Sequence, residues 1–407
     1  MSHAGHHRLL MGSPLRRPGT SLAIGAVLIV VLGLATVVHL SLLASADIDV
    51  ALVFLLALAI SSLLSLMPIA ALWFLDRRER EAPSLYAAAF LWGGLIATAF
   101  SLPFNTAFLG LVDIWVKENP VLMEILGPDA AQLIASPISA PIVEEITKAI
   151  GVLLLFWLLR PEFDNMRDGF VYGALIGVGF NWFEAALFVA QGYAEHGIAP
   201  FGSEFGLRFA LFGLGGHAMF TGLFGVSVGL ALQTQRTWLR ILAPIAGLIL
   251  AITAHVINNA LPLFDALARA EAGGPRPADD ELLSMGFLAA FVAGSVLELS
   301  IFVPFLLIIA VALWRSGVWE RRVIREELAD EVGSLLSTSE YEDIVADRIL
   351  RTRRIDGMHP RTSAALVNAQ HELAFRKRQV REQGNDPERD PIVAGWRDNI
   401  RRLRNAA

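Results

Sequence analysis

Long apolar segments restrict the fold of this chain more than any other feature of its sequence. The hydrocarbon core of a bilayer requires roughly 20 apolar residues for each crossing helix. Segments of that length recur along the chain, so we predict an all-α polytopic membrane protein with about eight transmembrane helices. The segments cover residues 21–43, 50–75, 84–110, 138–159, 168–190, 206–232, 240–262 and 284–314.

The composition supports this prediction and excludes several other classes of protein. Hydrophobic residues make up 55% of the 407-residue chain and charged residues only 18%, which is too apolar for a soluble protein of this length. The chain has no cysteine, so disulfides, thiolate nucleophiles and cysteine-ligated zinc are excluded. Basic residues are concentrated in the last quarter but are mixed there with acidic ones, so we expect no nucleic-acid partner.

The positions of the arginines predict the orientation in the membrane. Basic residues collect in the cytoplasmic loops of membrane proteins. The arginines near segment ends all fall on one side if both termini are cytoplasmic, and we expect a multi-pass protein of the cell's inner (plasma) membrane. These arginines are Arg8, Arg16, Arg17, the "DRRER" of residues 76–80, Arg160, Arg167, Arg236, Arg240, Arg315, Arg321 and Arg322.

Three regions follow from the pattern along the chain. Residues 1–20 are expected to form a cytoplasmic tail, 21–314 a transmembrane bundle, and 315–407 a small cytoplasmic helical tail. The first apolar segment ends in "ASA", a pattern similar to a signal-peptidase site, but its length favours a retained anchor. Residues 111–137 are expected to be a long, half-apolar outer loop that lies on the membrane or dips into it.

Polar side chains inside the apolar segments are the candidates for function. A charged group at membrane depth costs several kcal/mol and commonly marks a functional site. If the helix of 138–159 begins near Pro141, the polar groups of four helices fall in one layer within the outer half of the bilayer. The polar residues are Glu144, Glu145, Lys148, Asn181, Glu184, His217, His255, Asn258, Asn259 and Glu298.

The spacing of these residues is typical of groups that act together in acid–base catalysis and oxyanion stabilisation. Glu144 and Lys148 are four residues apart and share a helix face. Adjacent carboxylates in a medium of low dielectric constant resist double ionisation, so one is expected to keep a proton, as general acid–base chemistry requires. His255 and Asn259 are also four residues apart, and both are suitable hydrogen-bond donors to a developing oxyanion.

Each feature also has a plainer interpretation. Glu144 and Lys148 alone would fit a neutralised structural ion pair. His217 alone would fit a hydrogen bond between helices, and Asn258 would fit a polar contact that joins two helices. Glu298 lies deeper than the others, which favours a structural role or a place on the substrate path. The shared depth of these groups favours a functional site over scattered structural polar residues.

Four stretches of sequence around these polar residues resemble the PrsW family of intramembrane proteases. That family is related to the type II CAAX prenyl proteases and their bacterial relatives. The stretches are "PIVEEITK", "DGFVYGALIGVGFNWFE", "GGHAMFTGLFG" and "HVINN". They place the motifs of the wider group at Glu144 and Glu145, at Phe180 with Glu184, and at His255 with Asn259. The resemblance covers residues 135–262. Ala185 departs from the asparagine that PrsW-like sequences often have there.

The resemblance implies hydrolysis of a peptide bond by a glutamate-activated water. Either Glu144 or Glu145 would be the general base, and Glu184 and His217 would help to hold the water. His255 and Asn259 would stabilise the oxyanion, while Lys148 would tune the two glutamates. The implied partner besides the lipid bilayer is a single-pass membrane protein, such as an anti-sigma factor, cut near the extracytoplasmic face.

Metal dependence stays open at this point. Glu145, Glu184, His217 and His255 would form a plausible zinc-binding set of two carboxylates and two imidazoles.

Two other functions compete with proteolysis. A proton- or ion-coupled transporter would also use buried carboxylates, although no internal repeat typical of transporters is visible. A non-catalytic receptor or scaffold would leave the layer of polar groups unexplained.

Overall fold

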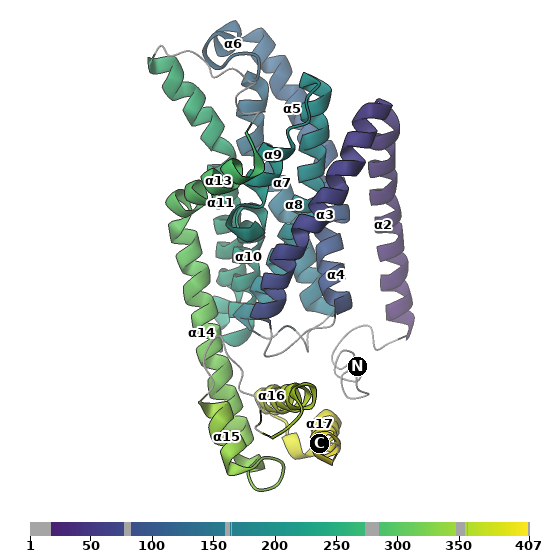
Figure 1. Cartoon of the computed structure of the whole chain (residues 1–407), viewed down its shortest axis with the longest axis vertical. Helices are drawn as coiled ribbons and strands as arrows, with labels where there is room; N and C mark the ends of the chain where they lie inside the picture. The colour runs from purple at the N-terminus through teal and green to yellow at the C-terminus, as the bar shows by residue number, and fades with distance from the viewer. Residues whose placement is uncertain are drawn as a thin grey trace.

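The computed structural model describes residues 18–76, 83–158, 163, 165–272, 285–346, 355 and 357–405. Within these ranges every named element is a helix (Figure 1). The elements are α2 (Pro18–Ser45), α3 (Ile48–Leu75), α4 (Pro83–Leu91), the π-helical η2 (Trp92–Ala97), α5 (Thr98–Glu118), α6 (Pro120–Leu126), α7 (Ala130–Leu158), α8 (Met166–His196), α9 (Phe201–Arg208), η3 (Ala210–Gly213), α10 (Gly216–Gln233), α11 (Thr237–Ala272), α13 (Phe287–Ile301), α14 (Val303–Leu328), η4 (Ala329–Glu331), α15 (Thr338–Val345), α16 (Pro360–Glu382), η5 (Pro387–Arg389) and α17 (Pro391–Asn405).

The chain is a multi-pass membrane protein. In its described part, 6 helices are long and apolar enough to cross a bilayer: α2, α3, the continuous α4–η2–α5, α8, α11 and α14. The prediction from sequence also counts α7 and α10 as spans. α7 carries three charged side chains in its middle, and α10 has only 18 residues, about 27 Å at 1.5 Å per residue. The count of eight and the orientation of the termini stay predictions.

α8 is the central helix of the bundle. Nearly all of its residues from Met166 to Ala186 are buried, as expected for a helix that is apolar on every side. Its N-terminus is fixed by a capping box of Asn165 and Asp168. Glycines allow α10 to cross it closely, since a Cβ at Gly177 would lie 2.2 Å from the carbonyl oxygen of His217. The position of α10 on α8 therefore fixes the position of His217.

Two expectations about the outer region are wrong. Residues 111–137 are mostly helical, because α5 continues to Glu118, α6 follows, and α7 already begins at Ala130. The apolar side chains of this region pack into a cluster of their own around Val112, Val116 and Leu126, which supports the longer helices. Pro141 therefore lies inside α7 and not in its first turn. Glu144 is roughly 21 Å along this helix and not near its start.

Two predicted helices are interrupted. The segment 206–232 is divided into the end of α9, the η3 turn and α10. The segment 284–314 is divided at Phe302 into α13 and α14. The first break has a clear backbone cause, because Leu211 and Phe212 have φ values of 49° and 58°. These left-handed conformations are costly for residues with a Cβ, and both breaks lie beside the site described below.

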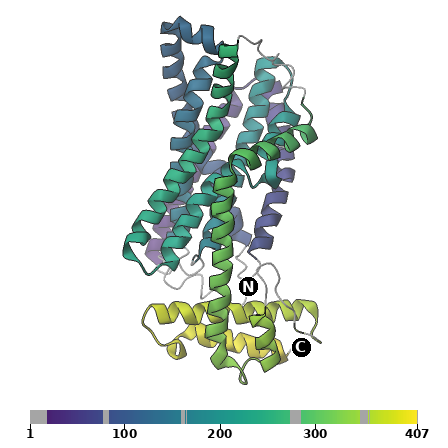
Figure 2. The same cartoon turned by 90° about the vertical axis from the view of Figure 1, so that its left-hand side faces the viewer.

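The C-terminal helices pack around an apolar cluster separate from that of the bundle. Its members include Leu328 of α14, Leu373 of α16 and Val393 of α17. Figure 2 shows α14 continuing from the bundle into this group of helices. The arginines Arg8, Arg16, Arg17 and Arg160, most of "DRRER", and residues 1–17 of the predicted N-terminal tail lie outside the described residues.

Candidate active site

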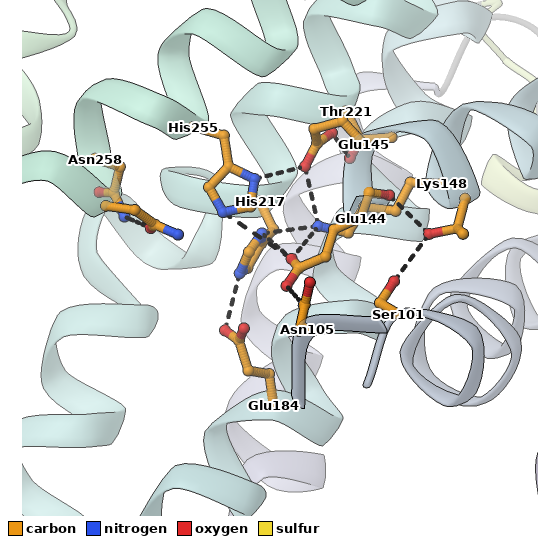
Figure 3. A network of polar contacts seen from close by, with 12 residues as sticks. Ser101, Asn105, Glu144, Glu145, Lys148, Glu184, His217, Thr221, His255 and Asn258 are labelled. Atoms are coloured by element: carbon orange, nitrogen blue, oxygen red, sulfur yellow. Dashed lines mark hydrogen bonds and ion pairs between the residues drawn. The ribbon is translucent and has the colours of Figure 1, made fainter. Parts of the chain in front are cut away.

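Four helices bring the predicted polar side chains into one buried cluster (Figure 3). α7 contributes Glu144, Glu145 and Lys148, and α8 contributes Glu184. His217 lies in the first turn of α10, and His255 lies in α11. We define these six side chains as the central cluster. Its members are separated by up to 111 positions in the sequence, so only the packing of the bundle brings them together.

Lys148 lies at the centre of the cluster and is 0% exposed. Its Nζ lies 3.2 Å from Oε2 of Glu144, 3.0 Å from Oε1 of Glu145 and 2.9 Å from Nδ1 of His217. An ammonium can only donate hydrogen bonds, so Nδ1 of His217 accepts. The Nε2–H of that neutral imidazole then donates to Oε2 of Glu184 over 2.9 Å. The network thus assigns the tautomer of His217.

The two adjacent glutamates have different surroundings. Glu145 is enclosed, since Thr221 donates to its Oε2 over 3.0 Å while its Oε1 contacts Lys148 and Nδ1 of His255. Glu144 instead faces a cavity, and Asn105 donates to its Oε1 over 3.1 Å. The structure therefore distinguishes two residues that the sequence left equivalent. Of the two, Glu144 is the one that lines the cavity.

Each imidazole contacts a second carboxylate on the side that faces away from Glu144. Oε1 of Glu145 lies 3.1 Å from Nδ1 of His255, and Oε2 of Glu184 lies 2.9 Å from Nε2 of His217. The opposite nitrogens, Nε2 of His255 and Nδ1 of His217, each lie 4.0 Å from the same Oε2 of Glu144. The two rings are nearly perpendicular, at 82°. Three donor atoms thus converge on one point at the edge of the cavity.

This convergence fits a metal ion. Glu144, His217 and His255 each offer a ligand atom, and these atoms lie within 4.8 Å of one another. One carboxylate and two imidazoles are a known donor set for catalytic zinc, and carboxylates behind the imidazoles are typical of such sites. Lys148 donates to two of these atoms, Oε2 of Glu144 and Nδ1 of His217, so an ion bound there would replace these two hydrogen bonds. The sequence-based set differs, because Glu145 and Glu184 lie behind the imidazoles.

The cavity above the cluster has a volume of about 670 Å³. Glu144, His217 and His255 lie at its inner end, and α5, α7, α8, α9, α11 and α13 supply its walls. Asn258 and Asn259 line it one turn beyond His255. There Asn259 donates to the carbonyl of Ser136 over 3.3 Å. Other lining residues include Ser101, Asn105, Thr106, Ser139, Phe180, Asn181, Leu187, Phe188, Gln191, Arg208, Pro262, Leu297 and Glu298.

Several residues of the site were not predicted from the sequence. Asn105 contacts Glu144 and accepts a hydrogen bond from Ser139 over 2.7 Å. Arg208 makes an ion pair with Glu184, with its Nε 3.4 Å from Oε2. Both are polar residues inside predicted membrane segments, so the rule that singled out the glutamates would have found them. Thr221 is different, because a threonine in an apolar helix gives no such signal.

Asn181 and Phe180 have supporting positions. Asn181 donates to the backbone carbonyl of Arg208 over 2.6 Å, which ties α8 to the end of α9. The Phe180 ring lies 3.6 Å below the ammonium of Lys148, a favourable contact for a desolvated cation. Phe220 stacks on His255 with ring centroids 4.9 Å apart. Aromatic rings thus enclose the cluster on the sides that carboxylates do not cover.

The fold and the site define a polytopic membrane protein with a carboxylate–imidazole centre inside the bundle. A family profile described as PrsW family intramembrane metalloprotease matches residues 81–309, more than half of the chain. The protein belongs to the PrsW family. The matched region contains the whole central cluster, together with Asn105 and Glu298. No curated protein and no solved structure matches the chain.

Proposed function

We propose that this protein is an intramembrane endopeptidase that hydrolyses a peptide bond of a membrane-anchored protein. The observation that carries the proposal is the position of Glu144. Glu144 lines the cavity, and its Oε2 lies 4.0 Å from a nitrogen of each histidine. Three groups that bind or deprotonate water therefore converge where a substrate carbonyl would lie.

The reaction follows from these positions. Glu144 accepts a proton as the water oxygen bonds to the carbonyl carbon. The C–N bond then breaks, and the same proton passes to the leaving nitrogen, so that one water is consumed and an acid and an amine are formed. Positioned general acid–base groups of this kind contribute roughly 10²–10⁴-fold to the rate. Asn259 on the cavity wall is placed to donate to the oxyanion after rotating away from Ser136.

Glu144, His217 and His255 would hold the metal that the family description implies, in which case Glu144 would bind the ion through Oε2 and its Oε1, beside Asn105, would be the oxygen left to accept the proton. A bound zinc ion would polarise the carbonyl and lower the pKa of the water. Glu145 and Glu184 fix the tautomers and orientations of the two imidazoles, whichever group binds the water. Lys148 balances the negative charge of the paired glutamates. Loss of any of these contacts would misplace the atoms that face the substrate.

The shape of the cavity supports a cut on the side of the membrane opposite the C-terminal helices. α5, α8 and α11 run away from those helices (Figure 1). On α8 and α11 the lining residues begin beside the cluster, at Phe180 and His255, and continue in that direction. If the C-terminal tail is cytoplasmic, as its arginines predict, the cavity extends toward the extracytoplasmic face. A single-pass protein such as an anti-sigma factor in the inner membrane is the proposed substrate.

The test compares the termini of membrane proteins by mass spectrometry in cells that produce the wild type or a variant. Glu144→Gln keeps the size of the side chain but removes the base, so we expect the new termini to disappear. Glu118→Gln is the matched control, because this carboxylate is exposed at the end of α5. Glu145→Gln should cause a smaller loss, since Glu145 acts through His255.

One result would reject the proposal. If cells with Glu144→Gln and cells with Glu145→Gln both keep the same termini as the wild type, while the variants are present at equal level, the paired glutamates do not serve proteolysis. Proton or ion flux through reconstituted vesicles would then test the transporter, which uses the same groups. Membership of the PrsW family favours the protease.

A further inference from the structure

Glu298 is a buried carboxylate that the proposed reaction does not use. It lies near the end of α13, is 8% exposed and lines the cavity together with Gly294 and Leu297 of the same helix face. Its carboxylate lies against the backbone at the start of α10, since a Cβ at Gly215 would be 3.3 Å from its Oε2. Its Oε2 is buried and has no hydrogen-bond partner in the described part of the chain.

The other carboxylates of the cavity all have cationic neighbours. Glu144 pairs with Lys148, and Glu184 pairs with Arg208. Among the described residues, no arginine, lysine or histidine makes an ion pair with Glu298. A buried carboxylate without a counter-charge is costly. An occupant of the cavity that brings a positive charge would remove this cost.

The position of Glu298 is determined by the contact between α13 and the turn that precedes α10. Leu211 and Phe212 adopt left-handed conformations, which are unfavourable for residues with a Cβ, in the turn before α10. That turn is bound to α13, because the N–H of Leu211 donates to Ser295 over 3.1 Å. Gly215 leaves room for the carboxylate, since a Cβ there would lie 3.1 Å from Cδ of Glu298. The fold thus holds α13 and Glu298 firmly against the start of α10.

We propose that Glu298 binds a lysine or arginine side chain of the substrate, an inference that rests on the proposed function. Glu298 lies against the start of α10, which carries His217, so the recognised side chain lies within a few residues of the bond that is cut. Glu298 is then a specificity-determining residue and does not take part in bond cleavage. A purely structural role at the start of α10 would not explain why Oε2 is buried without a hydrogen-bond partner among the described residues.

The experiment uses the termini that depend on Glu144. We expect the cut proteins to share a lysine or arginine at a fixed distance from the cut. The basic residue of one such substrate is changed to glutamine, and the full-length wild-type enzyme and its Glu298→Gln variant are compared on both substrates in vesicles. Glutamine keeps the size of the side chain, and thermal unfolding in detergent checks that the variant is folded.

We expect the loss of cleavage in the Glu298→Gln variant to depend on the basic residue of the substrate. Glu298→Gln should slow cleavage of the basic substrate at least tenfold, mainly through KM, and should have little effect on the neutral substrate. Equal effects of the variant on both substrates, or cut sites without a shared basic residue, would overturn the inference and leave the protease intact. Absence of any terminus that depends on Glu144 or Glu145 would instead overturn the proposed function, and this inference with it.

Discussion

Gly177 offers a direct test of how helix packing positions the site. A Cβ at this residue of α8 would lie 2.2 Å from the carbonyl oxygen of His217 and 2.7 Å from Cα of Ala218. Ordinary van der Waals contact begins near 3.4 Å. The atoms in the way belong to the backbone and not to a flexible side chain. Gly177→Ala must therefore move α10, with His217, by about 1 Å relative to α8.

The size of the effect follows from two separate costs. Overpacking of this kind destabilises a protein by about 1–3 kcal/mol. A displacement of about 1 Å at a reacting group costs up to ~10²-fold in rate. Because His217 holds Glu184 and faces Glu144, we expect a 10- to 100-fold slower cleavage by the folded variant. The loss should exceed what the fraction of unfolded protein explains.

Substitutions of two other glycines distinguish the loss of stability from the loss of catalytic rate. Gly225→Ala places a Cβ 1.9 Å from the carbonyl oxygen of Gly169 on the same two helices, but about two turns away from His217. It should lower thermal stability to a similar extent with less effect on the rate per folded molecule. Gly110→Ala has no atom within 4 Å of its Cβ and should change neither. Cleavage of a Glu144-dependent substrate in vesicles, with unfolding monitored in detergent, measures both quantities. Wild-type activity of Gly177→Ala would refute this account of how His217 is placed.

Further predictions concern charge, metal and pH. Lys148→Met leaves two buried carboxylates unbalanced, so thermal scanning should show a loss of about 3–5 kcal/mol; an unchanged midpoint would contradict the ion network. Elemental analysis of the purified protein should find zinc in the wild type and much less in His217→Ala, and equal zinc in both would exclude this donor set. Burial alone would raise the pKa of Asp390, but hydrogen bonds from Arg376 outweigh it and lower that pKa. Asp390 thus stabilises the C-terminal helices above its unfolded pKa of about 3.9, and this stability is lost as the pH falls below that value toward the lower folded pKa. Hydrogen exchange in α17 should show Asp390→Asn less protected at pH 7, with the difference vanishing at lower pH.

The sequence was a good guide to the class of fold and to the residues that form the central cluster. Apolar length determines that a segment is a helix in lipid, so the helical bundle was predictable. The cost of charge in lipid is enough to single out Glu144, Lys148 and Glu184 as candidates for function. Helix ends were harder to predict. Pro141 looked like a first-turn residue, but apolar packing of the outer region carries α7 back to Ala130.

The interruptions of two helices also could not be predicted from hydropathy. An apolar run such as that around Leu211 and Phe212 gives no sign of a left-handed turn. The turn exists because α13 binds it through Ser295 and packs beside it. This contact joins residues 84 positions apart, and a local pattern contains no information about it.

By itself the sequence determined that this is a membrane protein with carboxylates, imidazoles and one lysine at membrane depth, because composition and helical spacing are local properties. Tertiary structure alone decided how those groups divide their roles. Glu144 and Glu145 are neighbours on one helix, and only the helices packed around α7 place the first toward the cavity and the second against Thr221 and His255. Which side of a helix meets a cavity depends on all of its neighbours at once.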